Sequence, residues 1–292
     1  MNAAQQPLVF TCGEERLTGV VSRPERPRPR GVLMVVGGPQ YRVGSHRQFA
    51  LLANHLAGQG VAVLRFDYGG MGDSTGELKN FEQVGPDLRA AIDAFFGAVA
   101  ELRDVVIWGL CDAASAALFY AHQDARVSGV VLLNPWVRTA QGQAQTYLRH
   151  YYLGRLADPA LWRRIARGDF DLRGSFASLA QNVRRALGAT AGAPNDARDG
   201  VKQAASGSAR PLPERMADGF ARFNGRVLLI LSGNDLTAKE FQDVAAASQQ
   251  WRRLLALPRV TQHVLDGATH TFSRREWRDQ VAAWTAAWVL SW

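Results

Sequence analysis

Cys111, Asp235 and His270 are the residues whose types and spacing could do chemistry together. A cysteine thiolate attacks carbonyl carbons, a histidine takes up the thiol proton, and an acid fixes the tautomer of the histidine ring. Each of the three follows closely on an apolar run that is typical of a buried strand. If these strands lie side by side, the sequence predicts a catalytic group with Cys111 as nucleophile, His270 as base and Asp235 as orienting acid.

The motif Gly109-Leu110-Cys111-Asp112-Ala113 stands between an apolar run and a helical pattern. It has the form G-x-S-x-G, with cysteine in place of serine, and this form places a nucleophile on a sharp strand-to-helix turn. The turn needs small flanking residues, which Gly109 and Ala113 supply. The helix N-terminus should favour the thiolate of Cys111. The motif alone leaves a plain buried cysteine as the alternative.

Attack on a carbonyl also requires donors for the negative oxygen that forms, the oxyanion hole. We expect one donor to be the backbone N–H of Asp112, the residue after the nucleophile. The loop after the apolar run 31–36 should give the other, and Gly38 is the first choice there. Pro39 has no N–H, so Gln40 is held in reserve.

Other polar residues have simpler interpretations. Asp67 and Asp73 follow the apolar run 61–66 and are expected to brace that loop by hydrogen bonds, not to act as an acid–base pair. Ser115 lies one helical turn beyond Cys111 and is a poor rival nucleophile, because it points from the helix body. We expect no metal and no cofactor, because the other histidines lack metal-ligand spacing. These are His46, His55, His122, His150 and His263.

Strands and helices must alternate along the chain to bring these residues together. Such alternation predicts the α/β class, with a mostly parallel central sheet, helices on both faces and an N-terminal hairpin as an antiparallel edge. The expected strands are 7–12, 16–22, 31–36, 61–66, 104–108, 129–134, 227–232 and 260–265. The expected helices are 46–58, 81–100, the segment after Cys111, 238–257 and 273–290.

The alternation stops between residues 138 and 226. The first half of this segment has helical periodicity with aromatic residues, and the second half is rich in Gly, Ala, Pro, Ser and Asp. We predict a core domain formed by 1–137 and 227–292, and a partly flexible helical cap insertion at 138–226. An insertion at this point lies over the C-terminal ends of the strands, where ligands bind.

Charge and length limit the partners of the chain. The 292 residues carry a net charge of +8, and segment 138–226 holds 15 Arg and Lys against 7 Asp and Glu, so the whole excess lies there. No nucleic-acid motif accompanies this charge, so a solvated helical face is favoured over nucleic-acid binding. No apolar run is long enough to span a membrane, and the N-terminus has no signal-peptide pattern. A cytoplasmic protein with a small-molecule acyl substrate is expected. The sequence does not determine its oligomeric state.

The motifs RFDYGGMGDS, GLCDA, SGND and GATH, in the order nucleophile, acid, histidine, resemble the α/β-hydrolase superfamily. The stretches VVGGPQYRVGSHRQF, WGLCDAASAALFYA and LLNPWVRTAQGQAQTYLRHYYLGRL further resemble exosortase A system-associated hydrolase 1, a bacterial group encoded near exosortase and exopolysaccharide genes. The resemblance implies the α/β-hydrolase fold, the Cys111–Asp235–His270 assignment and a cytoplasmic enzyme. Two departures from the common pattern are Cys111 for serine and Val36 for histidine before the oxyanion glycine. Dienelactone hydrolases and some acyltransferases share the cysteine.

These observations predict a hydrolase that acts on an ester, thioester or lactone through an acyl-thioester on Cys111. One alternative is an acyltransferase that passes the acyl group to an amine, thiol or hydroxyl acceptor. A second is a catalytically silent binding protein on a hydrolase fold. A third is a redox-sensing thiol, which would lack a resolving partner because the other cysteine, Cys12, is expected in a remote strand.

Overall fold

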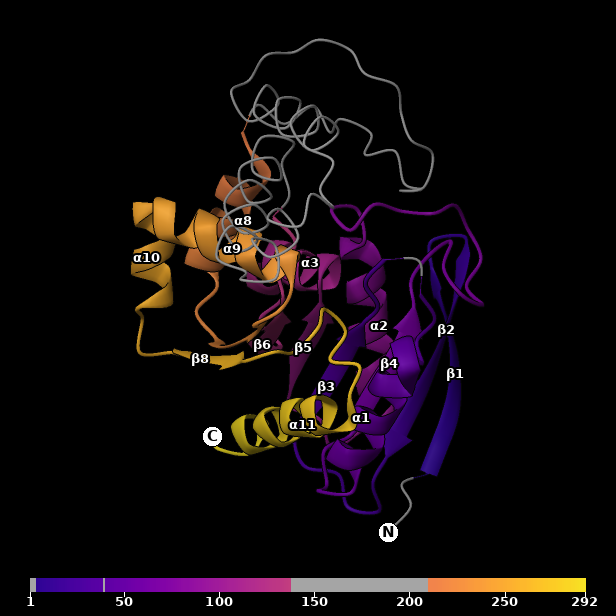
Figure 1. Cartoon of the computed structure of the whole chain (residues 1–292). Coiled ribbons are helices and arrows are strands. Elements are labelled where there is room, and N and C mark those ends of the chain that lie inside the picture. Colours follow the sequence, from indigo (N-terminus) through magenta and orange to yellow (C-terminus); the bar gives the residue numbers. More distant parts are fainter. Residues whose placement is uncertain (1–3, 39, 138–209) are drawn as a thin grey trace, which may run out of the picture.

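A single sheet of eight strands organises the chain, for which a computed structural model describes residues 4–38, 40–137 and 210–292 (Figure 1). The strand order is β1-β2-β4-β3-β5-β6-β7-β8. β1 and β2 pair antiparallel, β2 also runs antiparallel to β4, and all the other neighbours are parallel. The strands are β1 Ala4–Cys12, β2 Glu15–Arg23, β3 Arg30–Val35, β4 Val63–Asp67, β5 Asp104–Leu110, β6 Val127–Leu133, β7 Arg226–Ser232 and β8 Val260–Leu265.

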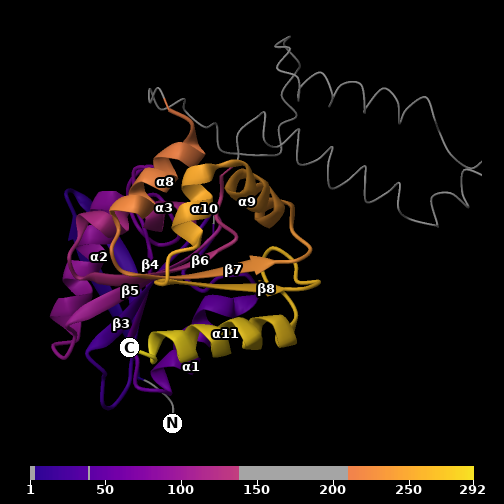
Figure 2. The ribbon, with the colours of Figure 1, turned by 90° about the vertical axis from the view of Figure 1, so that its left-hand side faces the viewer.

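Helices cover both faces of this sheet (Figure 2). One face carries α1 and α11, and the other carries α2, α3, α8, α9 and α10. The helices are α1 Gln48–Ala57, α2 Gly85–Ala98, α3 Asp112–Tyr120, α8 Leu212–Arg222, α9 Leu236–Ala247, α10 Gln249–Leu255 and α11 Arg275–Val289, with short 3-10 turns η1 Ser45–Arg47 and η2 Ala121–Gln123. This is the α/β-hydrolase architecture, as predicted.

The central strands are apolar on both faces because both faces are covered. In β3, Val32 and Met34 lie in the core beneath α1 and α11, whereas Leu33 and Val35 lie in the core beneath α2 and α3. Burial of each such side chain contributes about 1.5–3 kcal/mol to the free energy of folding. The continuous apolar runs of the sequence are therefore the signature of a sheet enclosed on two sides.

Two predicted helices have different limits in the structure. The helix predicted over 238–257 is two helices, α9 and α10, because Ser248 adopts extended geometry with φ −95° and ψ 124°. Its hydroxyl oxygen accepts a hydrogen bond from the N–H of Trp251 at 3.4 Å and so caps the second helix. The helix predicted over 81–100 begins only at Gly85, with Pro86 in its first turn, where proline is well accommodated.

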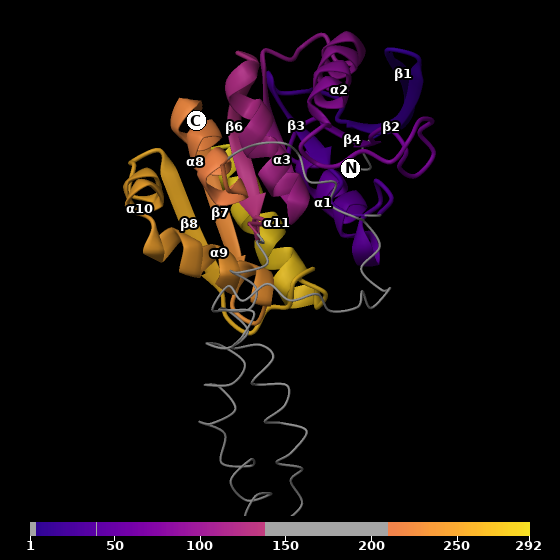
Figure 3. The same ribbon diagram turned by 90° about the horizontal axis from the view of Figure 1, so that it is seen from above.

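Helix α8 lies within the range 138–226 that the sequence assigned to a cap, yet it packs against α3 (Figure 3). Its residues Met216 and Phe220 are fully buried in the main core. A side chain at Gly219 would begin only 2.2 Å from the carbonyl oxygen of Leu118, so glycine permits this close approach. The core therefore includes α8, and the rest of the predicted cap, 138–209, lies outside the described residues.

Candidate functional site

Cys111 occupies the turn between β5 and α3. Its backbone has φ 63° and ψ −124°, a left-handed conformation that costs a non-glycine residue energy and is found at functional sites. Three backbone hydrogen bonds hold the turn in this conformation. The N–H of Cys111 donates to the carbonyl of Leu133 at 2.9 Å, and the carbonyl of Cys111 accepts from Ala114 at 3.1 Å and Trp136 at 3.2 Å. The strand-to-helix turn predicted from the sequence is present.

Small residues allow the turn to close. A side chain at Gly109 would begin 2.6 Å from the carbonyl carbon and oxygen of Ala113. A side chain at Gly37, in the loop after β3, would begin 2.3 Å from the carbonyl oxygen of Leu110. Both distances are well below van der Waals contact. Any larger residue at either position would therefore displace the strand-to-helix turn that carries Cys111 (the elbow).

Asp235 and His270 meet at the same edge of the sheet. Asp235 is the N-cap of α9, and its carboxylate accepts hydrogen bonds from the N–H groups of Thr237 at 3.3 Å and Ala238 at 3.1 Å. The Nδ1 atom of His270 lies 2.8 Å from Oδ2 of Asp235. The His270 side chain is 34% exposed and that of Asp235 9%. Because Nδ1 donates to the carboxylate, Nε2 is the ring nitrogen that remains for proton transfer.

Asn134, which the sequence reasoning did not single out, joins three of these loops. It is fully buried at the end of β6. Its side-chain amide donates to the hydroxyl of Ser232 at 2.8 Å and to the carbonyl of His270 at 3.0 Å, and its Oδ1 accepts from the N–H of Ser232 at 2.8 Å. Ser232 in turn donates to the carbonyl of Thr269 at 3.0 Å. The only sequence signal is an asparagine at a strand end before Pro135.

His270 lies close enough to the elbow to act electrostatically on Asp112. Burial raises the pKa of the Asp112 carboxyl, while backbone hydrogen bonds and the charge of His270 act in the opposite direction. β5, β6, β7 and β8 are consecutive parallel strands whose C-terminal ends lie at one edge of the sheet, so the loops that carry Cys111, Asp235 and His270 follow strands that end at that edge.

Two of the predicted oxyanion donors, the N–H groups of Gly38 and Gln40, have partners within the protein. The N–H of Gly38 donates to Oδ2 of Asp112 at 2.9 Å. The N–H of Gln40 donates to the carbonyl of Gly38 at 2.8 Å. The side-chain oxygen of Gln40 accepts hydrogen bonds from the hydroxyl of Ser45 at 3.0 Å and from its N–H at 3.2 Å. Gly38 and Asp112 are thus brought together, whereas Gln40 is committed to its own loop.

Asp67 and Asp73 brace the loop after β4. Asp67 is fully buried and accepts hydrogen bonds from the N–H of Arg42 at 2.7 Å and that of Asp73 at 3.2 Å. The guanidinium of Arg42 pairs with both carboxylates, at 2.8 Å in the case of Asp73. Ser74 ties the same loop to the backbone of Asp67 and Thr18.

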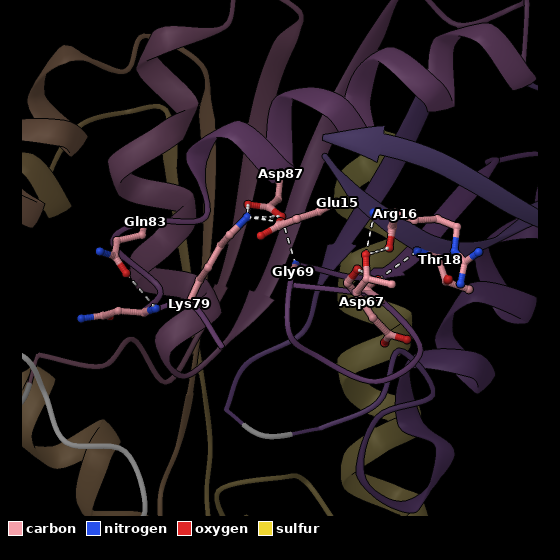
Figure 4. Close-up of polar contacts among 11 residues, drawn as sticks. Glu15, Arg16, Thr18, Asp67, Gly69, Lys79, Gln83 and Asp87 are labelled. Carbon is pink, nitrogen blue, oxygen red and sulfur yellow. Dashed lines mark hydrogen bonds and ion pairs between the residues drawn. The ribbon is translucent and has the colours of Figure 1, made fainter. Parts of the chain in front are cut away.

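A second charge network, drawn in Figure 4, lies beside this loop and was not predicted. Asp87 is fully buried, accepts from the N–H of Gly69 at 3.0 Å and pairs with Nζ of Lys79 at 3.0 Å. Lys79 also pairs with Glu15. Nearby Cys12, in β1, has its thiol pKa raised mainly by burial.

The remaining candidates fall outside the site. Ser115 is fully buried, and its hydroxyl donates to the carbonyl of Trp136 at 2.7 Å. Within the described part of the chain, no three His, Cys, Asp or Glu side chains gather as metal ligands. Across those same residues, no helix has both the length and the apolar character that crossing a bilayer demands.

Comparison with known proteins places this arrangement in a family. The model of the alpha/beta hydrolase family matches residues 32–284. No curated protein sequence matches the chain. Among solved structures, the chain is similar to an esterase from Pyrococcus furiosus, with 13% identity, a TM-score of 0.65 and coverage of 99% of this chain and 92% of that one.

Two further structures have the same fold. One is a dienelactone hydrolase from Anabaena variabilis, with 15% identity, a TM-score of 0.62 and coverage of 100% of this chain and 99% of that one. The other is an alpha/beta hydrolase from a Penicillium species, with 16% identity, a TM-score of 0.62 and coverage of 99% and 100%. The family match spans most of the sequence, and the sheet described above agrees with it. The chain belongs to the alpha/beta hydrolase family and is an enzyme, a hydrolase.

Proposed function

We propose that this hydrolase cleaves carboxylic esters, thioesters or lactones of small molecules through Cys111, His270 and Asp235. The observation that carries the proposal is the backbone of Cys111, held at φ 63° at the head of α3, on the sheet edge where His270 and Asp235 are paired at 2.8 Å. Strained geometry of this kind persists where it serves a function.

The chemistry follows from the placement of each group. His270 takes the thiol proton on Nε2, and Asp235 stabilises the imidazolium through Nδ1. The thiolate forms a bond to the carbonyl carbon, and the carbonyl π electrons move onto oxygen. When the carbonyl re-forms, the bond to the leaving group breaks, and His270 protonates that group. The acyl group remains as a thioester on Cys111.

Water completes the cycle in a hydrolase. His270 removes a proton from water, the hydroxide oxygen attacks the thioester, and the Cys111 thiolate leaves and is reprotonated. The structure of the esterase from Pyrococcus furiosus and that of the dienelactone hydrolase share this fold, which supports ester or lactone substrates as the first to test.

Acyl transfer is the second candidate for the fate of the thioester. It is favoured by Cys111 itself, since a thioester reacts readily with amines and thiols, and by the likeness of three stretches to exosortase A system-associated hydrolase 1. In that case an amine, thiol or hydroxyl acceptor would take the acyl group in place of water.

Intact-protein mass spectrometry tests both hydrolysis and acyl transfer. The enzyme is mixed briefly with p-nitrophenyl esters of increasing chain length and with acyl-CoA thioesters, beside Cys111→Ala. A mass increase equal to one acyl group, absent from Cys111→Ala, is the expected result. If the unaltered enzyme forms no adduct and Cys111→Ala still turns over the substrate, the nucleophile is a residue other than Cys111.

The acceptor is identified in the same experiment. Loss of the adduct at a rate independent of added amine, thiol or polyol indicates hydrolysis. A rate that rises with the acceptor, together with the acylated product, indicates transfer. Cys12→Ala is the matched control, because it removes the other cysteine, which lies in β1 away from the elbow.

A further inference from the structure

The side chain of Asp112 accepts hydrogen bonds from two backbone N–H groups, and one of them, that of Gly38, is a predicted oxyanion donor. Oδ2 accepts from Gly38 at 2.9 Å, and Oδ1 accepts from Ala113 at 2.9 Å. One of the two donors expected to hold a negative oxygen of the substrate, the N–H of Gly38, therefore already holds a carboxylate oxygen of the protein.

The local sequence fits this carboxylate closely. A side chain at Gly37 would begin 2.4 Å from Oδ1 of Asp112, so the glycine leaves room for the carboxylate against the loop. Gly38 has φ 61°, a conformation that glycine adopts without strain, and its N–H points at Oδ2. The arrangement is thus built by both loops and does not depend on the Asp112 rotamer alone.

The electrostatic surroundings make this carboxylate available to a ligand. No Lys or Arg of the described residues forms an ion pair with Asp112. His270 acts electrostatically on this carboxylate, and Asp112 helps to raise the pKa of the buried Tyr68 after the larger effect of burial. Once moved away from the backbone N–H groups, a partly buried carboxylate needs a new donor, or it incurs a large desolvation cost.

We propose that the Asp112 carboxylate occupies the oxyanion hole of the resting enzyme, and that a substrate opens the hole by offering this carboxylate a hydrogen-bond donor on the acyl group beside the scissile carbonyl. Asp112 is then a specificity-determining residue. It disfavours acyl groups without a 2-hydroxyl, because these displace the carboxylate and offer it no new hydrogen-bond donor. It favours 2-hydroxyacyl groups, whose hydroxyl can donate to the displaced carboxylate. The inference rests on the proposed function, because it uses the same nucleophile and the same hole.

Aldehydes test the hole without turnover. The thiol of Cys111 adds to an aldehyde carbon to form a hemithioacetal, and the former carbonyl oxygen, protonated by the thiol proton or held as an anion, enters the oxyanion hole. The probes are propanal and 2-hydroxypropanal labelled with ¹³C at the carbonyl carbon, and NMR titration gives the dissociation constant of each adduct. Cys111→Ala identifies the signal, because it forms no hemithioacetal.

Removal of the carboxylate should reverse the preference. In Asp112→Ala, propanal is expected to bind about tenfold more tightly than in the unaltered enzyme, the effect of one net hydrogen bond. In the unaltered enzyme, the dissociation constant of propanal divided by that of 2-hydroxypropanal should be above one. In Asp112→Ala this ratio should fall toward one. Asp112→Asn keeps the shape but removes the charge, so its propanal affinity should be intermediate.

Three results would overturn the proposal: weaker propanal binding in Asp112→Ala, an unchanged ratio of the two constants, or no hemithioacetal in that variant. The first would make Asp112 a brace of the Gly38 loop. Glu276→Ala is the matched control, since it also removes a carboxylate from a first helical turn, at an exposed site in α11. If the aldehyde results hold but no ester, thioester or lactone is cleaved, the proposed function fails together with the preference among acyl groups, and only the placement of the Asp112 carboxylate in the hole stands.

Discussion

Two groups of carboxylates in this enzyme are stabilised in different ways. The charge-paired carboxylates, Asp67, Asp87 and Asp124, are buried and each pairs with Arg or Lys. The amide-held carboxylates, Asp112 and Asp235, accept hydrogen bonds from backbone N–H groups. Among the described residues no Lys or Arg forms an ion pair with either, and His270 bonds Asp235 and acts electrostatically on Asp112.

Under the proposed mechanism, this difference separates carboxylates that hold loops together from carboxylates that take part in the reaction. A carboxylate beside a fixed cation is neutralised, and it holds loops together without changing state. A carboxylate held by backbone N–H groups and a histidine keeps a charge that a proton, a ligand or a reacting group can use. The sheet edge that carries Cys111 has the second kind, and the loops beyond β4 have the first.

The largest expected effect is that of Asp235→Asn. Because the amide cannot stabilise an imidazolium and can select the wrong tautomer of His270, kcat/KM for a cleaved ester should fall about 10³–10⁴-fold. Asparagine also caps helices well, so the free energy of unfolding should change by less than about 1 kcal/mol. Steady-state kinetics beside urea denaturation check both statements. A small kinetic loss would remove Asp235 from the mechanism and weaken the contrast.

Lys79→Ala should show the opposite pattern. It leaves the fully buried Asp87 without its cation, so the free energy of unfolding should fall by about 3 kcal/mol, as when one member of a buried pair is removed. The kcat/KM of the folded enzyme should be unchanged. Urea denaturation gives the first quantity. The neutral pair Lys79→Met with Asp87→Asn is the control and should recover part of the loss. A stable, inactive Lys79→Ala enzyme would contradict the division between the two groups.

The pair of Asp124 and Arg126 predicts a pH dependence of stability. Hydrogen bonds from Arg126 are the main cause that lowers the pKa of Asp124 to about 2. A lowered carboxyl pKa gives stability that is present above the unfolded value near 4 and is lost as pH falls from about 4 to 2. Asp124→Asn should therefore unfold about 2 kcal/mol more easily than the unaltered enzyme at pH 6.

At pH 3 the gap between the two proteins should narrow. Urea denaturation at the two pH values measures it. A gap independent of pH would show that Asp124 acts through packing or through its neutral hydrogen bond with Tyr120.

The smallest effect is expected at Asp93. Its carboxylate pairs with the same Arg126 at 2.7 Å, but its side chain is 58% exposed. Solvent screens such a pair, so Asp93→Asn should change the free energy of unfolding by no more than about 0.5 kcal/mol. Thermal denaturation in low and high salt checks the value. A loss as large as that at Asp124 would mean that burial is not what distinguishes strong pairs here.

Much of the fold follows from local pattern. The runs 31–36, 61–66 and 227–232 predicted β3, β4 and β7 because strands enclosed on two faces must be apolar throughout. The alternation of strand and helix predicted the parallel sheet. Helix limits were less certain: the break at Ser248 depends on one hydroxyl group that caps α10, and serine occurs in many helices without such a role.

For the site, residue types and chain order predicted Cys111, Asp235 and His270 as the catalytic group, because each follows a strand that ends at the same edge. Hydrogen bonds between loops distant in sequence were not accessible in this way. Asn134 joins the end of β6 to Ser232 and to the His270 loop, which lie 98 and 136 residues further along the chain, and a lone asparagine carries no sign of such partners.

The sequence by itself determined the sheet, the strand-to-helix turn and which residue types stand at the strand ends, because these depend on local periodicity and small residues. Only the tertiary structure decided which donors each carboxylate meets. Asp112 was chosen from the sequence for its backbone N–H, yet folding places its side chain against Gly38, and no sequence pattern records that contact. Its pKa and partners come from burial and from loops joined in space, which the order of residues along the chain does not specify.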